Sequence, residues 1–252
     1  MYNHAVPCLR NRFFVHICVS YYFYMQTLLL LHGAIGASDQ FVNLAEALGD
    51  TYNVRTMDFS GHGGKPFPKG ELSIQFFAEE VKAFIDSEGP GKVSIFGYSM
   101  GGYVAMYLAK HYPAMVDKII TLATKFHWDE ETAAKETKML NAEKTEEKVP
   151  AFAQALAKRH APNDWKELFF RTATMLNAMG RDNPLKAEDY ATIENPSMIL
   201  IGDKDKMITL DETVNVYRAL PNAQMGMLPA TQHPIEQVNL PYLLFYIRQF
   251  IQ

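Results

Sequence analysis

The chain has 252 residues, of which 48% are hydrophobic and 21% are charged, so it has the composition of an ordinary globular protein and is not disordered throughout. Its formal charge of -4 does not supply the broad basic surface that non-specific nucleic-acid binding needs, and no nucleic-acid partner is expected. Two cysteines, Cys8 and Cys18, are too few for a disulfide framework or a cysteine-based zinc cluster.

The first 24 residues need a separate interpretation. The apolar run Phe13–Tyr24 lacks the small-residue cleavage site that follows the apolar part of a signal peptide. His16 and Ser20 interrupt the run, which argues against a membrane span, and stable membrane insertion is not expected. We interpret residues 1–24 either as edge strands rich in aromatic and β-branched residues, or as an extension upstream of a natural start at Met25.

From Thr27 onward, short apolar strands alternate with helical patterns. Strands are expected at Thr27–Leu31, Asn53–Met57, Lys92–Phe96, Lys118–Leu122, Ser197–Ile201 and Gln224–Leu228. Helices are expected from a cap at Ser38 to Gly49, after a second cap at Ser73, and at Met100–His111, Asp211–Leu220 and Pro234–Ile251. Wholly apolar strands separated by helices predict an α/β fold with a mostly parallel central sheet flanked by helices on both faces.

One long segment interrupts this alternation. No strand pattern occurs between Thr124 and Pro196. Helical patterns occupy Glu130–Lys148, Ala151–Lys158 and Trp165–Met179. A simple connection is rarely so long, so we predict a helical cap, residues 125–196, inserted before the last two strands. It would lie over the carboxyl edge of the sheet, where ligands bind in open α/β folds, and residues 25–124 and 197–252 would form the core.

The pattern G-x-S-x-G carries the first chemical signal, in Gly97-Tyr98-Ser99-Met100-Gly101. A serine in this pattern lies on a sharp strand-to-helix turn that exposes its hydroxyl at the edge of the sheet. The bare pattern is common, but here an apolar strand precedes it and a helix of small residues follows it. Ser99 is therefore predicted to be a nucleophile, and the alternative is a structural serine in a glycine-rich turn.

A serine hydroxyl needs a base, and the base needs a carboxylate that orients it. His233 follows the last predicted strand, in a loop that would overhang the sheet edge, and we predict that it is the base. Two carboxylates follow the preceding strand. Asp205 lies further into that loop and is the predicted acid, with Asp203 as the alternative.

The negatively charged oxygen of a tetrahedral intermediate needs two hydrogen-bond donors held in place before the reaction. The backbone amide of Met100, at the start of the helix after Ser99, is predicted to be one donor. The loop after the first strand provides the other, and we choose the amide of Ala34. His32 in the same loop is interpreted as a structural brace rather than a base.

These segments together resemble the α/β-hydrolase superfamily, and they occur in the family's order along the chain. The matching segments are Leu31-His32-Gly33, Asp58-Phe59-Ser60-Gly61-His62-Gly63, Gly97-Tyr98-Ser99-Met100-Gly101-Gly102, Gly202-Asp203-Lys204-Asp205 and His233. The resemblance extends from about Thr27 to Gln252. The usual N-terminal strand pair is not recognisable in residues 1–24, and Pro234 follows the predicted base.

The resemblance implies that Ser99, Asp205 and His233 form a catalytic triad. It also implies an oxyanion hole formed by the amides of Ala34 and Met100, and an insertion that acts as the family's cap. The implied reaction is acyl transfer to water, which requires no metal or organic cofactor. A serine nucleophile argues against haloalkane dehalogenase and epoxide hydrolase chemistry, for which this family uses a carboxylate.

The substrate is expected to be a small molecule, a small or medium carboxylic ester with an apolar acyl part, in a cytoplasmic enzyme of undetermined oligomeric state. Residues that could line an apolar pocket are Ile35, Tyr98, Phe126, Trp128, Met139, Phe169, Met175 and Met179, although cap residues of this kind could equally pack on each other and on the sheet. Thioesters, lactones, carbon–carbon bond hydrolysis, a ligand-sensing signalling protein with weak hydrolysis and a binding module remain alternatives.

Overall fold

The computed structural model describes residues 25–89 and 91–252, and the predictions for residues 1–24 lie outside these ranges. Its strands form one sheet in the order β2-β1-β3-β4-β5-β6, in which every neighbouring pair is parallel. The strands are β1 (Thr27–Leu31), β2 (Asn53–Met57), β3 (Val93–Tyr98), β4 (Val116–Leu122), β5 (Ser197–Gly202) and β6 (Ala223–Leu228). The predicted mostly parallel central sheet is confirmed.

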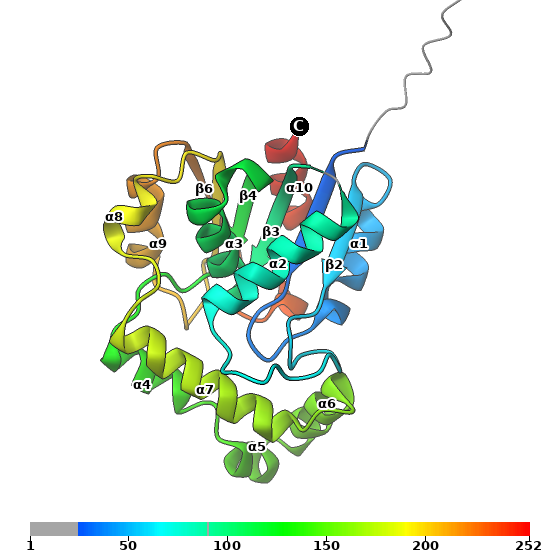
Figure 1. Cartoon of the computed structure of the whole chain (residues 1–252), viewed down its shortest axis with the longest axis vertical. Helices are drawn as coiled ribbons and strands as arrows, with labels where there is room; N and C mark the ends of the chain where they lie inside the picture. Colours follow the sequence, from blue (N-terminus) through cyan, green and yellow to red (C-terminus); the bar gives the residue numbers. More distant parts are fainter. Residues whose placement is uncertain (1–24, 90) are drawn as a thin grey trace, which may run out of the picture.

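Helices cover both faces of this sheet (Figure 1). They are α1 (Val42–Leu48), α2 (Ile74–Glu88), α3 (Met100–His111), α9 (Leu210–Ala219) and α10 (Leu240–Ile251). Side chains alternate along a strand, so Leu29 and Leu31 of β1 pack with α2 and α3, whereas Leu28 and Leu30 pack with α1 and α10. Burial on both faces explains why four consecutive leucines, Leu28–Leu31, occupy β1.

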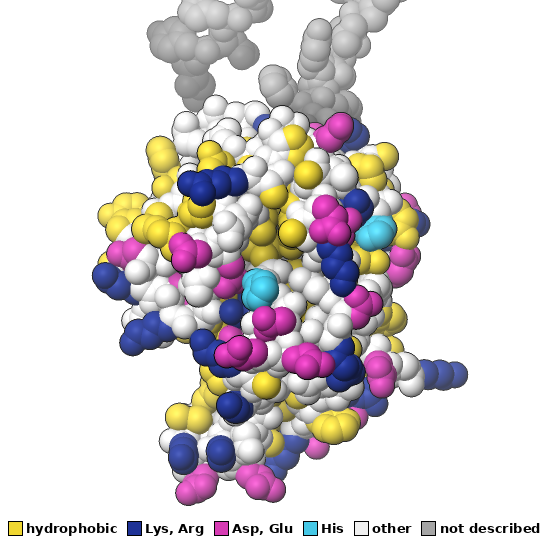
Figure 2. Space-filling view, turned by 90° about the vertical axis from the view of Figure 1, so that its left-hand side faces the viewer, with side chains coloured by type: hydrophobic (Ala, Val, Ile, Leu, Met, Phe, Trp, Pro, Cys, Tyr) yellow, Lys and Arg dark blue, Asp and Glu magenta, His cyan; other side chains and the backbone are white. Residues whose placement is uncertain are grey.

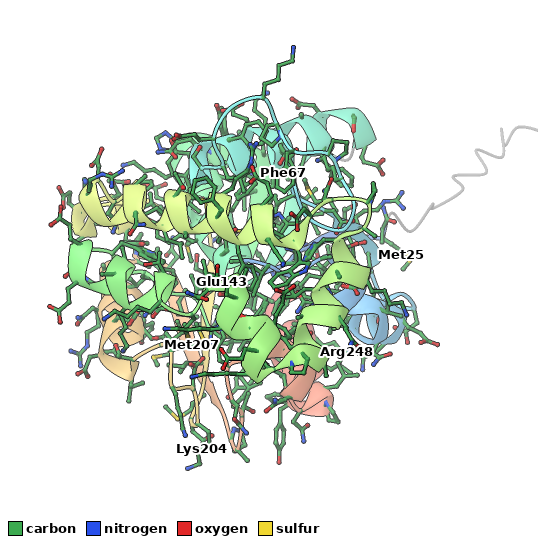
Figure 3. All side chains as sticks on the ribbon, turned by 90° about the horizontal axis from the view of Figure 1, so that it is seen from below. Met25, Phe67, Glu143, Lys204, Met207 and Arg248 are labelled. Carbon is green, nitrogen blue, oxygen red and sulfur yellow. The ribbon has the colours of Figure 1, made fainter. Side chains whose placement is uncertain are left out.

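The segment between β4 and β5 is helical, as predicted. It contains α4 (Glu130–Thr137), α5 (Ala142–Lys148), α6 (Pro150–His160), α7 (Trp165–Arg181) and the short α8 (Ala187–Tyr190). We call α4 to α7 the cap. These helices lie beyond the carboxyl ends of the strands in Figure 1 and extend across that end of the molecule in Figure 3. Helices α4 and α7 pack closely, because a Cβ atom at Gly180 would lie 2.6 Å from the Cβ atom of Ala133.

Two predicted helical stretches are each divided by an asparagine cap. Glu130–Lys148 forms two helices, because the side chain of Asn141 accepts a hydrogen bond from the Lys144 amide and begins α5. Pro234–Ile251 contains a 3-10 turn, Ile235–Gln237, and then α10, whose first turn is capped by Asn239 and contains a proline. The predicted helical patterns are confirmed, but each stretch contains two helical elements rather than one.

Of the two predicted helix caps, the one at Ser73 is confirmed and the one at Ser38 is not. Ser73 accepts a hydrogen bond from the Phe76 amide at 3.0 Å and caps α2, as predicted. Ser38 is the first residue of a 3-10 turn, and its side chain caps no helix. Its amide instead donates to the carboxylate of Asp58 at 2.7 Å, so the acceptor comes from the loop after β2. The prediction of a Ser38 cap was therefore wrong.

The lengths of the helices and the distribution of surface charge bear on membrane and nucleic-acid partners. Across the described ranges, no helix combines the length and apolar character needed to cross a membrane. On the face shown in Figure 2, basic and acidic side chains are interspersed rather than gathered into a broad patch of one sign. That face offers no extended basic surface for a phosphate backbone.

Candidate active site

Ser99 lies on the turn between β3 and α3, with φ = 51° and ψ = -117°. A positive φ is rare for residues other than glycine, and strained backbone of this kind is concentrated at functional sites. Glycines allow the turn to form. A Cβ atom at Gly97 would lie 2.4 Å from the Gly102 nitrogen, and one at Gly101 would lie 2.2 Å from the Leu31 carbonyl oxygen. The turn thus holds the half-buried Ser99 at the carboxyl end of the sheet.

The loops after β5 and β6 bring Asp205 and His233 together. Nδ1 of His233 lies 2.9 Å from Oδ2 of Asp205, whose side chain has no solvent exposure. The other carboxylate oxygen accepts the amides of Met207 and Ile208. Burial opposes ionisation of Asp205, but the hydrogen bonds from His233 and these amides outweigh it and lower its pKa. Because a carboxylate only accepts, Nδ1 of His233 carries the proton and Nε2 remains free to act as a base.

Two further side chains hold the His233 loop in place. Asp203, the alternative acid, accepts the amide of Thr231 at 3.1 Å and contacts Lys204, rather than the imidazole. The hydroxyl of Tyr98 donates to the carbonyl oxygen of His233 at 3.0 Å, and the two rings lie 5.7 Å apart. Burial raises the pKa of Tyr98, so its hydroxyl stays protonated as a donor. Tyr98 was predicted to bind substrate, and here it lines the cavity and also supports His233.

The two predicted oxyanion-hole residues border the same cavity as Ser99. Within the described residues, neither the Ala34 amide nor the Met100 amide donates a hydrogen bond to the protein. The loop that carries Ala34 passes directly beside Ser99, because a Cβ atom at Gly33 would lie 3.2 Å from the Ser99 Cβ atom. Ile35, next in the chain, has φ = 54°. Two unpaired amides therefore border the cavity that contains the Ser99 hydroxyl.

His32 braces the Ala34 loop, which is the role predicted for it. Its ring is fully buried, Nε2 accepts the amide of Phe59 at 3.2 Å, and Nδ1 donates to the carbonyl oxygen of Gly33 at 2.8 Å. Burial lowers its pKa to about 4, so the ring is neutral at pH 7. Both ring nitrogens are engaged, which leaves His32 no free nitrogen to act as a base.

His160 of α6 connects the cap to the same loop. Its Nδ1 accepts the amide of Gly63 at 3.1 Å, and its Nε2 donates to the carbonyl oxygen of Ile35 at 3.0 Å. Burial lowers the pKa of this imidazole, which favours the neutral form that these two bonds require. His160 was not among the predicted site residues, because a helical pattern does not reveal which polar side chain points inward.

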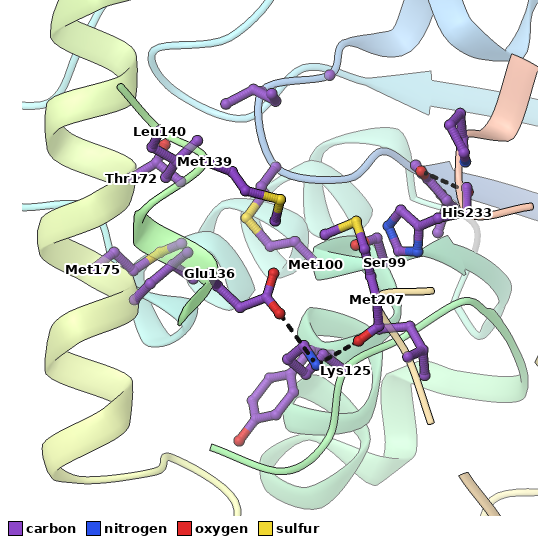
Figure 4. A pocket seen from close by; sticks show the side chains of 18 of the residues that line it. Ser99, Met100, Lys125, Glu136, Met139, Leu140, Thr172, Met175, Met207 and His233 are labelled. Carbon is purple, nitrogen blue, oxygen red and sulfur yellow. Dashed lines mark hydrogen bonds and ion pairs between the residues drawn. The ribbon is translucent and has the colours of Figure 1, made fainter. Parts of the chain in front are cut away.

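A cavity of about 380 Å³ lies between the core and the cap and contains Ser99 and His233 in its wall (Figure 4). This volume is within the usual range for small-molecule sites. Its apolar wall includes the predicted residues Ile35, Tyr98, Trp128, Met139, Phe169, Met175 and Met179, together with Met100 and Met207. Phe126 does not line this cavity. It packs against Tyr190 and borders a neighbouring hollow, so the prediction for Phe126 was wrong.

Two charged side chains, Lys125 and Glu136, were not predicted but also line the cavity. Nζ of Lys125 donates to the carbonyl oxygen of Met207 at 2.7 Å and lies 3.4 Å from Oε1 of Glu136 (Figure 4). Nζ is also 3.8 Å from a carboxylate oxygen of Glu212 in α9. This ion-pair cluster joins the segment after β4 to the cap.

Comparison with known proteins identifies the family to which this fold and site are similar. The α/β hydrolase fold family model matches residues 26–187, more than half of the chain. An esterase/lipase-named protein of Haemophilus influenzae is 33% identical over 95 residues, which cover 38% of this chain and only 33% of that protein. A pimeloyl-acyl-carrier-protein methyl ester esterase of Aeromonas hydrophila is 26% identical over 240 residues, or 84% of this chain and 92% of the relative.

Solved structures support the same fold. MenH from S. aureus has a TM-score of 0.73 with this chain at 21% sequence identity, and the match covers 90% of this chain and 93% of MenH. At that identity the likeness concerns the fold alone. The match of the family model over more than half of the residues establishes membership: the chain belongs to the α/β-hydrolase fold family.

Proposed function

We propose that this enzyme is a serine esterase that cleaves small or medium carboxylic esters with an apolar acyl part. The observation that carries the proposal is the shared cavity. It contains the Ser99 hydroxyl on its sharp turn, the imidazole of His233 held by Asp205, and two amides without protein acceptors. Nucleophile, oriented base and oxyanion donors are the parts that acyl transfer requires.

In the proposed first step, Oγ of Ser99 attacks the ester carbonyl carbon while Nε2 of His233 takes the hydroxyl proton. The carbonyl oxygen becomes negative and accepts hydrogen bonds from the amides of Ala34 and Met100. The imidazolium then donates its proton to the leaving alcohol as the carbon–oxygen bond breaks. Asp205, whose lowered pKa keeps it ionised, stabilises the imidazolium throughout.

In the second step, His233 removes a proton from water, and the resulting hydroxide attacks the acyl-enzyme carbonyl. The same two amides stabilise the second tetrahedral intermediate, and Ser99 leaves as the proton returns to it. The acid is released with the enzyme unchanged. The apolar cavity wall favours an apolar acyl chain, because five of its side chains are methionines that adapt to chains of different shape.

Hydrolysis of p-nitrophenyl butyrate, hexanoate and octanoate by the wild type and by Ser99→Ala tests the proposal. We expect the substitution to lower kcat/KM by on the order of 10³-fold or more. Labelling with a fluorophosphonate should modify Ser99 in the folded wild type and nothing in the variant. Equal hydrolysis by the two proteins would rule the mechanism out. Labelling without ester hydrolysis would retain the nucleophile but indicate another substrate class, such as a thioester or a lactone.

A further inference from the structure

Glu136 of α4 is an unusual residue to find in the wall of an apolar cavity. Only 5% of the residue is exposed, yet it borders the cavity beside Met100 and Met175 (Figure 4). A buried carboxylate is costly unless it is paired and hydrogen-bonded. The hydrogen bonds and ion pairs of Glu136 therefore show which of its acceptor positions the protein leaves free.

The protein supplies Glu136 with an incomplete set of partners. Its closest charged partner is Nζ of Lys125 at 3.4 Å, and within the described residues no group donates a hydrogen bond to its carboxylate. Lys125 is itself shared, because Nζ donates to the Met207 carbonyl oxygen and lies near Glu212. A carboxylate has about four acceptor positions. Most of those of Glu136 are left for a molecule in the cavity.

The charges around the cavity also favour an uncharged ligand over an anionic one. Among the residues that the structure describes, two cationic side chains line the cavity, those of Lys125 and Arg159. Lys125 faces Glu136 and Glu212, and Arg159 faces two further carboxylates, those of Asp39 and Glu236. Four carboxylates thus surround two cations, and each cation is already paired. A carboxylate on a bound ligand would find no free cation among these residues, and it would be repelled by the excess negative charge.

We propose that Glu136 determines substrate specificity. Its carboxylate selects ester substrates whose acyl chain is uncharged and carries a hydrogen-bond donor such as a hydroxyl, and it rejects acyl chains that end in a carboxylate. The donor completes the hydrogen bonding of Glu136, whereas the rest of the chain contacts the methionine-rich wall. This inference rests on the proposed esterase function for its kinetic test, but the binding preference itself does not depend on hydrolysis.

The kinetic test compares p-nitrophenyl hexanoate, p-nitrophenyl 6-hydroxyhexanoate and the p-nitrophenyl monoester of adipic acid. In the wild type we expect kcat/KM for the adipate ester to be at least about tenfold below that for hexanoate, and the hydroxy ester to be the best of the three. In Glu136→Gln, which keeps the shape and removes the charge, we expect the ratio of adipate to hexanoate to rise by about tenfold and the preference for the hydroxy ester to weaken.

Glu212→Gln is the matched control. It removes a second carboxylate from the same lysine but lies outside the wall of this cavity. A glutamine oxygen can still accept the Thr209 amide at the start of α9, although the Phe126 amide then loses its acceptor. We expect it to leave the adipate-to-hexanoate ratio within about threefold of the wild type. The proposal is overturned if the wild type cleaves the adipate ester as well as hexanoate. It is also overturned if Glu136→Gln leaves the ratio unchanged, or if both variants change it equally.

Binding to Ser99→Ala separates this inference from the esterase proposal. The probes are 6-hydroxyhexanamide and the monoamide of adipic acid, titrated by NMR. We expect the hydroxy amide to bind at least about tenfold more tightly, with the difference lost when Glu136→Gln is added. If the wild type cleaves no ester but this preference persists, the esterase proposal fails and the role of Glu136 stands. Equal binding of the two amides, or binding of neither, overturns the role of Glu136.

Discussion

The two aspartates after β5 are close in sequence but have different partners, and this difference allows a direct test at the residue scale. Asp205 accepts Nδ1–H of His233, whereas Asp203 accepts the amide of Thr231. An asparagine at 205 can present an N–H group to the imidazole and stabilise the wrong tautomer. We therefore expect Asp205→Asn to lower kcat/KM for ester hydrolysis by about 10³–10⁴-fold.

Asp203→Asn is the control for this substitution, because an asparagine can still accept the Thr231 amide through its side-chain oxygen. We expect it to lower kcat/KM by less than about tenfold. Steady-state kinetics with one p-nitrophenyl ester would measure both effects. Equal losses of kcat/KM in the two variants, or a larger loss in Asp203→Asn, would show that Asp205 is not the acid of the triad.

The sequence predicted the positions that follow the strands better than those in the cap. Ser99, Asp205 and His233 each come just after an apolar strand, and parallel strands end at one edge of the sheet. Chain order therefore indicates that these side chains meet. Lys125 and Glu136 could not be found in this way. The position of Glu136 depends on which face of α4 turns toward the cavity, and that of Lys125 depends on the path of the segment after β4. The prediction for Phe126 was wrong for a similar reason, because an aromatic side chain fits equally well in the wall of a cavity and in the packed interior, and the sequence does not distinguish the two.

At the scale of secondary-structure elements, the position of α3 depends on close approach to β1. A Cβ atom at Gly101 would lie 2.2 Å from the carbonyl oxygen of Leu31, which is backbone and cannot move as a flexible side chain does. We expect Gly101→Ala to lower the free energy of unfolding by about 1–3 kcal/mol, because α3 must shift away from the strand. Urea denaturation at pH 7 would measure the change.

Gly70→Ala provides the comparison, since a Cβ atom there meets nothing within 4 Å and its φ is not positive. We expect its free energy of unfolding to stay within about 0.5 kcal/mol of the wild type. Gly101→Ala should also reduce ester hydrolysis, because the shift carries the Met100 amide with α3. Similar stability of both alanine variants would contradict the close-packing argument.

The attachment of α6 to the core gives a second test at this scale. His160→Ala removes the partners of the Gly63 amide and the Ile35 carbonyl oxygen. We expect a loss of about 1–3 kcal/mol in the free energy of unfolding, and a fall in kcat/KM because the Ala34 loop is held less firmly. Lys158→Ala, an exposed change on the same helix, should alter neither. An active and fully stable His160→Ala protein would show that the cap does not position this loop.

At the scale of the whole molecule, three buried histidines join the loops after β1 and β2 to the cap. The rings of His32 and His62 lie 5.0 Å apart, and those of His62 and His160 lie 5.9 Å apart. Burial lowers the pKa of all three, to about 4 for His32. Asp58 and Asp39 oppose this shift at His32, and Arg159 adds to it at His160, but burial has the largest effect at each ring.

These lowered pKa values make the stability of the fold sensitive to acid. An unfolded histidine binds a proton near pH 6.5, whereas the folded rings bind one only at lower pH. Between these values the unfolded state holds more protons, so the free energy of unfolding rises with pH and falls as the solution is acidified. The contribution of the neutral histidines to the free energy of unfolding is fully present above about pH 6.5 and is lost toward pH 4, and the part due to His32 is about 3 kcal/mol.

Urea denaturation between pH 7.5 and pH 5 would measure this loss. His62→Leu should make it smaller, because Nε2 of His62 is buried without a partner and the leucine cannot be protonated. His127→Ala should change it little, since that side chain is 65% exposed and its ion pair with Asp129 lies at the surface. A free energy of unfolding that does not vary over this range, or equal slopes in all three proteins, would exclude the histidines as the cause.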